Sequence, residues 1–434
     1  MEATLITAII FVLFFILLSS GQPVFAALAT ASIVGILLLQ GPRGLGAVSG
    51  VLYDRLNSFT LVAVPLFILM GEAVFVTGIG SELYTAANSW LNKVRGGMAM
   101  ASVLASAVFG ALCGVSIAGA AAIGSFAIPE MLKRGYHKSL AVGPVTAAGA
   151  LSLLIPPSIA FIVYGEVADE SVGKLFLGGV VPGLVLTLLM IAYIFVVCLF
   201  KPHYAPLPTE SISWKARFKS LEKIWPALTL IALVLGTIYF GVCTPTESAA
   251  VGCVGSFLII LMRGKLGWKV IREILQRTML TTGMILIIFS SAMLFGYILT
   301  RLQAPQMIIS LVQGAQLPPW AIMTLAMTIL IVMGMFMDIV SVILISTPLL
   351  LPMMLELGHS ALWYGIIVGL TCEMAVITPP IGLNLFVIKG VSPDHITLQD
   401  ITKAALPFVF VEIICLIIFI VFPDLCLWLP NQMG

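Results

Sequence analysis

The residues best suited to binding a ligand lie in two proline pairs inside otherwise apolar stretches. The first break runs through Pro156 and Pro157 to Ser158, and the second covers residues 378–384 (TPPIGLN). Proline lacks a backbone N–H and its ring clashes with the preceding turn, so a proline pair leaves several carbonyls without helical partners. Free carbonyl and hydroxyl oxygens suit a hard cation such as sodium, whereas the N-termini of half-helices attract anions. A single break would favour a plain kink, but two breaks at related positions favour a binding site.

Two short segments are candidates for turns that meet these breaks, namely residues 113–119 (CGVSIAG) and 334–341 (GMFMDIVS). Asp338 stands out in the second segment, because a carboxylate at membrane depth costs about 2.5 to 3.5 kcal/mol. We expect Asp338 to line a cavity or bind a cation. Capping the N-terminus of a helix at the turn is an equally good interpretation and is compatible with the first.

Four glutamates, Glu72, Glu247, Glu373 and Glu412, also lie within or beside apolar runs. Glu247 ends the segment 244–247 (TPTE). It is either a first-turn residue favoured by the helix dipole or a direct ligand, and the sequence leaves both interpretations open. Glu412 is the weaker candidate for a direct role.

Other chemistries find no support in the residue pattern. The seven cysteines form no CxxC pair, and the four histidines have no HExxH or comparable ligand spacing. A GxxxxGK[ST] motif is absent, so we do not expect ATP hydrolysis by a P-loop in this chain. Without a GxGD motif or a Ser/His constellation at depth, we expect no enzyme, and the energy for any transport must come from an ion gradient or another subunit.

The elements that must position these residues are membrane-spanning helices. Of 434 residues, 60% are hydrophobic and only 9% are charged, against about 25% charged residues in a soluble domain. The longest apolar runs have the length of a membrane-spanning helix. They cover residues 5–19, 24–40, 60–75, 176–200, 225–240, 246–262, 282–299 and 404–422. We expect a multi-pass membrane protein, and the absence of a basic face argues against nucleic-acid binding.

Basic residues give the expected topology. They concentrate in residues 93–95, 133–138, 201–223 and 263–277. The positive-inside rule assigns these segments to the cytoplasm. The stretch 96–132 therefore begins and ends on one side, and it is too short for two crossings of about 20 residues each. We predict a re-entrant helical hairpin over 96–132, a retained first span over 1–19, and both chain termini outside the cytoplasm.

The chain contains an internal repeat. Pro352 corresponds to Pro129, and Pro379 corresponds to Pro156. The spacing is the same in both pairs, since 352 − 129 and 379 − 156 both equal 223. We therefore predict two repeats, residues 1–210 and 211–434. The first contains the hairpin 96–132 and the break 155–158, and the second contains a hairpin over 320–356 and the break 378–384.

Each repeat would cross the membrane about five times. Because this number is odd, the second repeat would have the opposite orientation in the membrane. The expected fold is thus an all-α polytopic membrane protein with two inverted repeats, each with a re-entrant hairpin and a broken helix. Inverted repeats with discontinuous helices recur in secondary transporters, where substrate and ions bind near the midplane. A channel is the rival interpretation, but twin hairpins offer no obvious open pore.

Four motifs together resemble a known family. They are residues 65–72 (PLFILMGE), 113–124 (CGVSIAGAAAIG), 244–247 and 378–384. Their order is similar to that in the large membrane subunit of tripartite ATP-independent periplasmic (TRAP) transporters, over about residues 5–425. The resemblance implies an elevator-type transporter in the inner membrane of a bacterial cell, surrounded by lipid, with both termini periplasmic.

The resemblance also implies coupling to Na⁺ and two protein partners. A small four-helix membrane subunit supports the scaffold, and a periplasmic binding protein delivers the substrate. The chain is too short to include that small subunit, so we expect it to be a separate polypeptide. Substrates in this family are organic acids, such as C4-dicarboxylates, sialic acids and other sugar acids. A stand-alone secondary anion/cation symporter of related elevator fold is the alternative.

Motif by motif, the resemblance implies a set of site residues. The implied sodium ligands are Gly114, Ser116, Pro156 and Ser158 in the first repeat and Asp338, Ser341, Thr378 and Pro379 in the second. The implied substrate contacts are Gly119 and Asn384. Val115 and Gly119 stand where many relatives have serine and threonine, so we expect coordination at the first turn to rely more on backbone carbonyls.

Overall fold

The computed structural model describes residues 3–206 and 212–432, and every regular element in these ranges is a helix. Eight of the described helices are long and apolar enough to cross a membrane. The prediction of an all-α, multi-pass membrane protein is therefore confirmed. The predicted boundary between the repeats, at residues 210 and 211, lies outside the described residues, as do residues 1, 2, 433 and 434.

The α-helices follow one another along the chain with short connections. In the first part they are α1 (Ala3–Ser19), α2 (Val24–Gln40), α3 (Gly46–Leu56), α4 (Ala63–Thr77), α5 (Ile79–Leu91), α6 (Gly97–Cys113), α7 (Ser116–Lys133), α8 (Lys138–Gly149), α9 (Ile159–Ala168) and α10 (Val172–Phe200). In the second part they are α11 (Trp214–Tyr239), α12 (Pro245–Met262), α13 (Trp268–Arg301), α14 (Ala304–Gly314), α15 (Pro319–Phe336), α16 (Ile339–Glu356), α17 (Ala361–Val376), α18 (Leu383–Val391), α19 (Leu398–Val421) and α20 (Asp424–Leu427).

Helix boundaries repeat at the spacing found in the sequence. Helix α7 begins at Ser116 and ends at Lys133, and α16 begins at Ile339 and ends at Glu356; 339 − 116 and 356 − 133 both equal 223. The helices that follow them, α8 and α17, start at 138 and 361, again 223 apart. The two halves of the chain thus place their helix pairs, turns and proline breaks in the same order.

The structure adds helices that the search for apolar runs did not find. Helix α3 buries none of its residues, and α5 and α14 have one apolar and one polar face, so none of the three contains a long apolar run. Helix α13 begins at Trp268, well before the predicted span 282–299, because no proline interrupts the charged segment that precedes the span. Helix α11 likewise extends back to Trp214.

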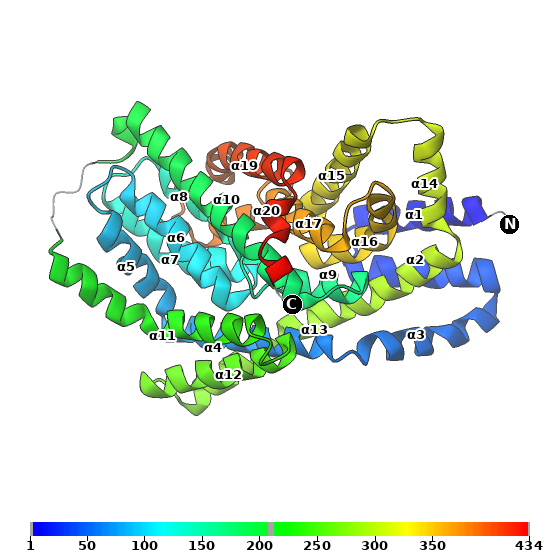
Figure 1. Ribbon diagram of the computed structural model, residues 1–434, viewed down its shortest axis with the longest axis horizontal. Helices are drawn as coiled ribbons and strands as arrows, with labels where there is room; N and C mark the ends of the chain where they lie inside the picture. The colour runs from blue at the N-terminus through cyan, green and yellow to red at the C-terminus, as the bar shows by residue number, and fades with distance from the viewer. Residues whose placement is uncertain (1–2, 207–211, 433–434) are drawn as a thin grey trace.

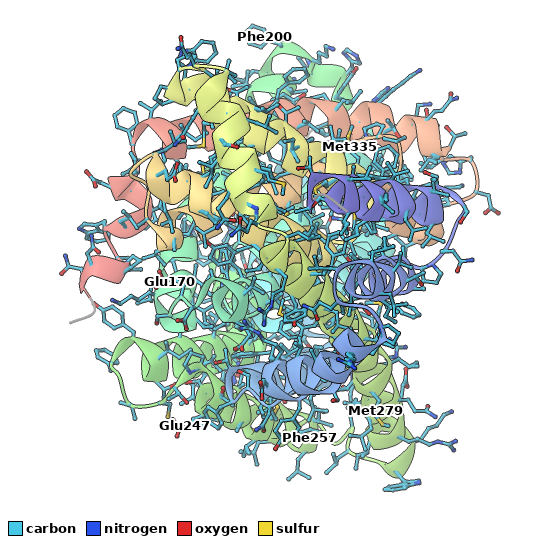
Figure 2. All side chains as sticks on the ribbon, turned by 90° about the vertical axis from the view of Figure 1, so that its right-hand side faces the viewer. Glu170, Phe200, Glu247, Phe257, Met279 and Met335 are labelled. Carbon is cyan, nitrogen blue, oxygen red and sulfur yellow. The ribbon has the colours of Figure 1, made fainter. Side chains whose placement is uncertain are left out.

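The helices form one elongated assembly (Figure 1). Helices α5 to α8 lie at one end and α14 to α16 at the other, with α9, α10 and α17 between them. Helices α3, α4 and α12 run along the lower edge in this view. Figure 2 shows Phe257 of α12 and Met279 of α13 at the outside of the molecule, and Met279 is 71% exposed. Such exposed apolar side chains suit contact with lipid or another membrane subunit.

The two halves pack through direct contacts between their helices. The Tyr164 hydroxyl on α9 donates a hydrogen bond to the Ala361 carbonyl at the start of α17, at 2.7 Å. At Gly143 on α8, an added Cβ atom would lie 2.4 Å from the carbonyl oxygen of Ala404 on α19, so only glycine permits this approach. Elements far apart in the sequence therefore form one body around the two proline breaks.

The predicted inversion can be tested at the matched ends of α7 and α16. Lys133 and Glu356 are both exposed and occupy corresponding positions. With Cys243 replaced by serine, since it is the one cysteine that is not buried, we expect Lys133→Cys to react with a membrane-impermeant maleimide only from the cytoplasmic side. Glu356→Cys should react only from the opposite side. Labelling of both from the same side of sealed vesicles would rule out inverted repeats.

Candidate functional site

The turn between α6 and α7 is closed by a glycine in the left-handed region. Gly114 has φ +62° and donates its N–H to the Gly110 carbonyl at 2.9 Å. A Cβ atom at this position would lie 2.7 Å from the Pro157 carbonyl oxygen. The Ile159 N–H also donates to the Gly114 carbonyl, at 3.4 Å. The first turn therefore touches the first proline break, and the close approach requires glycine.

The first break interrupts the path from α8 to α9. Helix α8 continues into a short 3₁₀ turn at Ala150–Leu153, and residues 154–158 are not helical. The Pro156–Pro157 peptide bond is cis. The buried Ser158 hydroxyl donates to the Leu153 carbonyl at 2.5 Å, across the break. This serine therefore satisfies one of the carbonyls that the break would otherwise leave free.

The second turn is capped by an aspartate. Between α15 and α16, Met337 and Asp338 are extended, and the Asp338 carboxylate accepts hydrogen bonds from the Ser341 N–H, at 3.0 Å, and from the Ser341 hydroxyl. This confirms the N-cap interpretation of Asp338. Asp338 also lines a pocket, so capping and lining a cavity occur together.

The second break lies between α17 and α18. Residues 377–382 are not helical, and the Pro379–Pro380 peptide bond is cis. The Thr378 hydroxyl donates to the Met374 carbonyl at 2.5 Å. Gly382, with φ +53°, precedes the first residue of α18. The second break thus repeats the form of the first, with a hydroxyl bonded back to the end of the preceding helix.

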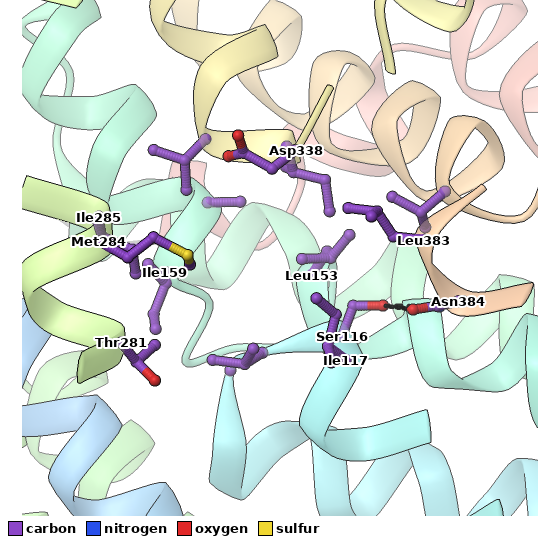
Figure 3. Close-up of a pocket in the computed structure, with 16 residues that line it drawn as sticks. Ser116, Ile117, Leu153, Ile159, Thr281, Met284, Ile285, Asp338, Leu383 and Asn384 are labelled. Carbon is purple, nitrogen blue, oxygen red and sulfur yellow. Dashed lines mark hydrogen bonds between the residues drawn. The ribbon is translucent and has the colours of Figure 1, made fainter. Parts of the chain in front are cut away.

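A hydrogen-bonded pair joins the first turn to the second break (Figure 3). The Asn384 side-chain amide donates to the Ser116 Oγ at 2.8 Å, and the Ser116 Oγ lies 3.2 Å from the Asn384 Oδ1. Both side chains are buried. The family resemblance pairs each turn with the break of its own repeat, so this contact between the two halves was not predicted.

A pocket of about 90 Å³ lies where the turns and breaks meet. Four helices contribute their first two residues to its wall: Ser116 and Ile117, Ile159 and Ala160, Ile339 and Val340, Leu383 and Asn384. Helix N-termini carry unpaired N–H groups and partial positive charge, which favour an anion. Gly114, Leu153 and Val376, at the C-terminal ends of other helices, also line the pocket, and the partial negative charge of helix C-termini favours a cation.

One wall of the pocket comes from α13. Thr281, Met284 and Ile285 face the turns from this long helix (Figure 3). The sequence analysis missed these residues, because they lie in an apolar helix without a break, a motif or a charge. The polar side chains of the pocket are Ser116, Thr281, Asp338 and Asn384. The remaining lining is apolar, which makes the few polar groups the determinants of what binds.

The structure brings some of the predicted site residues to the pocket and places others behind it. Gly114, Ser116, Asp338 and Asn384 line the pocket directly. The other predicted residues lie in the breaks, in the second turn or further along α7; these are Pro156, Ser158, Ser341, Thr378, Pro379 and Gly119. Gly119 faces away toward Ser152, whose Oγ would lie 2.7 Å from an added Cβ.

Glu247 lies at the start of a helix and has a structural role there. Glu247 forms a capping box with Thr244 at the start of α12, which confirms its interpretation as a first-turn residue. No group of three or more His, Cys, Asp or Glu side chains that could hold a metal ion occurs in residues 3–206 and 212–432. A cation at the pocket would therefore rely on carbonyls, hydroxyls and the Asp338 carboxylate.

The sequence matches a family model along most of its length. Residues 11–425 match the model described as "Tripartite ATP-independent periplasmic transporter, DctM component". The chain is 38% identical to the C4-dicarboxylate TRAP transporter large permease protein DctM of Pseudomonas aeruginosa, over 92% of each chain. It is 32% identical to the isethionate TRAP transporter permease protein DctMQ of Oleidesulfovibrio alaskensis, covering 94% of this chain and 64% of the relative.

A sialic acid TRAP transporter large permease protein, SiaM of Vibrio cholerae, is 29% identical over 96% of each chain. Among solved structures, the Alcanivorax borkumensis YdaH transporter superimposes with a TM-score of 0.64 and 13% identity, covering 94% of this chain and 97% of that one. At this identity the likeness concerns the fold alone, which is that of a membrane transporter. The named relatives are permeases, in agreement with the prediction that the chain is not an enzyme.

The bond between Ser116 and Asn384 can be measured with a double-mutant cycle. We expect Ser116→Ala and Asn384→Ala to be coupled by about 1 kcal/mol in the free energy of unfolding of the detergent-solubilised protein, because each removes the other's partner. Ser102→Ala is the matched control, since the buried Ser102 hydroxyl bonds only within its own helix, to the Ala99 carbonyl. When Ser102→Ala is combined with Asn384→Ala, the two changes in the free energy of unfolding should add within about 0.5 kcal/mol. Equal coupling in both cycles would contradict a specific contact.

Proposed function

This chain belongs to the DctM component family of tripartite ATP-independent periplasmic transporters, and from that premise we propose that it imports an organic acid by coupling to sodium. As the large permease subunit it is a multi-pass membrane protein of a bacterial transporter. We place it in the inner membrane, with both termini periplasmic. The coupling ion, the substrate class and the mechanism in the following paragraphs are parts of this proposal.

The observation that carries the substrate class is the convergence of four helix N-termini on one pocket. Their N–H groups and partial charges favour an anionic group, and the Ser116 and Asn384 side chains add neutral donors beside them. The relatives are named for C4-dicarboxylates, isethionate and sialic acid, and all three are organic acids. We propose that Asn384 contacts the acid group. Gly119, which faces Ser152, would take part only after a rearrangement of α7.

The sodium sites we propose combine each turn with the break of its own half. Gly114 and Ser116 would act with Pro156 and Ser158 in the first half. Asp338 and Ser341 would act with Thr378 and Pro379 in the second half. Carbonyl and hydroxyl oxygens from turns and breaks supply the hard ligands that sodium prefers, and the Gly114 to Pro157 approach supports the first of these sites.

The size of the pocket supports an opening movement. A volume of about 90 Å³ accommodates an ion with a few water molecules. Ligand pockets for small organic molecules measure about 300 to 1,000 Å³. We propose that the two turns separate from α13 to admit the acid, and that the hairpins then move together against a scaffold that includes α13, as in an elevator.

Two partners complete the proposed transporter. A small four-helix membrane subunit would rest against the apolar outer surface of the scaffold. A periplasmic binding protein would deliver the acid and set most of the selectivity. The DctMQ relative is longer than this chain, which covers 64% of it.

Reconstitution tests the whole proposal. In proteoliposomes that contain this chain, the small subunit and a loaded binding protein, we expect uptake only when sodium is higher outside than inside. Removing the sodium gradient, or any one component, should abolish uptake. Uptake that continues without sodium would contradict sodium coupling. Uptake by this chain alone would favour a stand-alone symporter.

Substitutions at the turns test the proposed ligands. We expect Asp338→Asn to raise the sodium concentration for half-maximal uptake about tenfold or more, because loss of a charged ligand corresponds to about 1.5 to 3 kcal/mol. Ser116→Ala should raise it by a smaller factor. Glu222→Gln, at an exposed position away from the pocket, is the control and should leave it unchanged. Unchanged sodium affinity in both turn variants, with normal membrane insertion, would remove these residues from the sites.

A further inference from the structure

Two glutamates that the proposed mechanism does not use are completely buried. Glu373 on α17 and Glu412 on α19 each have an exposed fraction of 0%. None of their four carboxyl oxygens has a hydrogen-bond partner. No salt bridge reaches either carboxyl group in the described part of the chain. Buried carboxylates are normally paired with a cation or with several donors, so this arrangement requires an explanation.

The two carboxyl groups belong to one local cluster between neighbouring helices. They interact electrostatically with each other, and α17 is tied to α19 by a hydrogen bond from the Trp363 Nε1 to the Phe419 carbonyl, at 3.0 Å. The backbone amide of Leu154, next to the first break, lies near the Glu373 carboxyl group without completing a hydrogen bond. The pair therefore lies where the second half of the chain packs against the first break.

Other titratable groups around the pair are thiols and carboxyls, not bases. Cys372 directly precedes Glu373 on α17, and Cys415 lies three residues after Glu412 on α19. Both thiols are buried. None of these groups supplies a positive charge. A carboxylate at either position would therefore remain without compensation.

The repeat shows that the fold does not require carboxyl groups here. At the spacing of 223 residues, Glu373 corresponds to Ala150 (373 − 223) and Glu412 corresponds to Leu189 (412 − 223). Both counterparts are apolar; Ala150 lies in the 3₁₀ turn after α8, and Leu189 lies in α10. The two glutamates are therefore an addition to the second half, and their chemistry is the feature to explain.

Electrostatics restricts what the pair can bind. Removing one ionised carboxylate from water costs several kcal/mol, and two unpaired negative charges in one apolar cluster repel each other as well. A metal ion would need a third ligand of the usual types, and none joins the pair in the described residues. A proton on each carboxyl group removes both charges and needs no further ligand.

We propose that Glu373 and Glu412 form a proton-binding site in which both carboxyl groups hold a proton at neutral pH. When a carboxyl group ionises, its O–H bond breaks and the proton leaves as H⁺; no other covalent bond changes. Ionisation would place negative charge against α19 and the first break, and Glu373 lies four residues before Ile377, where the second break begins. Protonation of the pair therefore holds α17 in the packing that positions the second break. This inference is independent of sodium coupling and of the substrate.

Infrared spectroscopy of the purified full chain tests the protonation directly. At neutral pH we expect a carbonyl stretching band from protonated carboxyl groups, and Glu373→Gln and Glu412→Gln should each remove part of it. Glu222→Gln is the control, because this exposed carboxyl group is ionised and should not contribute. A band that neither variant reduces would overturn the proposal. A band that appears only after sodium is removed would also overturn it, since sodium would then occupy the pair.

Stability provides a second measurement that does not depend on transport. The folded protein binds more protons than the unfolded chain at neutral pH, so the free energy of unfolding should fall as pH rises. In Glu373→Gln and Glu412→Gln the amide has the shape of the neutral carboxyl group but does not ionise. We therefore expect both variants to fold, and their free energy of unfolding to fall less as pH rises. Glu222→Gln should retain all of it. Variants with the same alkaline loss of stability as the unsubstituted chain would contradict a proton site.

Discussion

Lipid offers no hydrogen-bond partners to a polypeptide backbone, and this constraint governs the centre of the structure. Each proline break and each hairpin turn frees N–H and carbonyl groups that must be satisfied by protein or by a polar cavity. In this chain the turns and breaks meet one another. Gly114 approaches the Pro157 carbonyl, Ser158 bonds back across the first break, and Thr378 bonds back to the end of α17. A pocket lined by the ends of the interrupted helices lies where the turns and breaks meet.

Duplication explains why the pocket carries both kinds of helix end. One break alone would supply one N-terminus and one C-terminus. Two hairpins and two breaks supply four N-termini, at α7, α9, α16 and α18, with the carbonyl ends of the preceding helices beside them. A cation and an acid have opposite electrostatic requirements, and helix ends of both kinds line this one pocket. The remaining wall comes from α13, a helix without a break.

The sequence was informative wherever local chemistry controls the backbone. Paired prolines cannot sit inside a regular helix, and a glycine between apolar runs marks a turn, so the non-helical positions could be located from residue types alone. Packing between helices was less predictable. The bond between Ser116 and Asn384 joins residues 268 apart, and Thr281 faces the pocket from a helix without any local signal. Helices α3, α5 and α14 were missed because a helix that lies along a surface needs no long apolar run.

The differences between the halves are as informative as their similarity. A repeated fold can be built with apolar residues at 150 and 189, as the first half shows, yet the second half carries Glu373 and Glu412 at the corresponding positions. Two buried carboxyl groups without partners are costly if charged and inexpensive if protonated. The second half also carries Asp338, the one acidic side chain in the pocket wall. All three of these acidic side chains, Asp338, Glu373 and Glu412, lie in the second half of the chain, so the two halves share an order of helices but differ in the buried charge that they could carry.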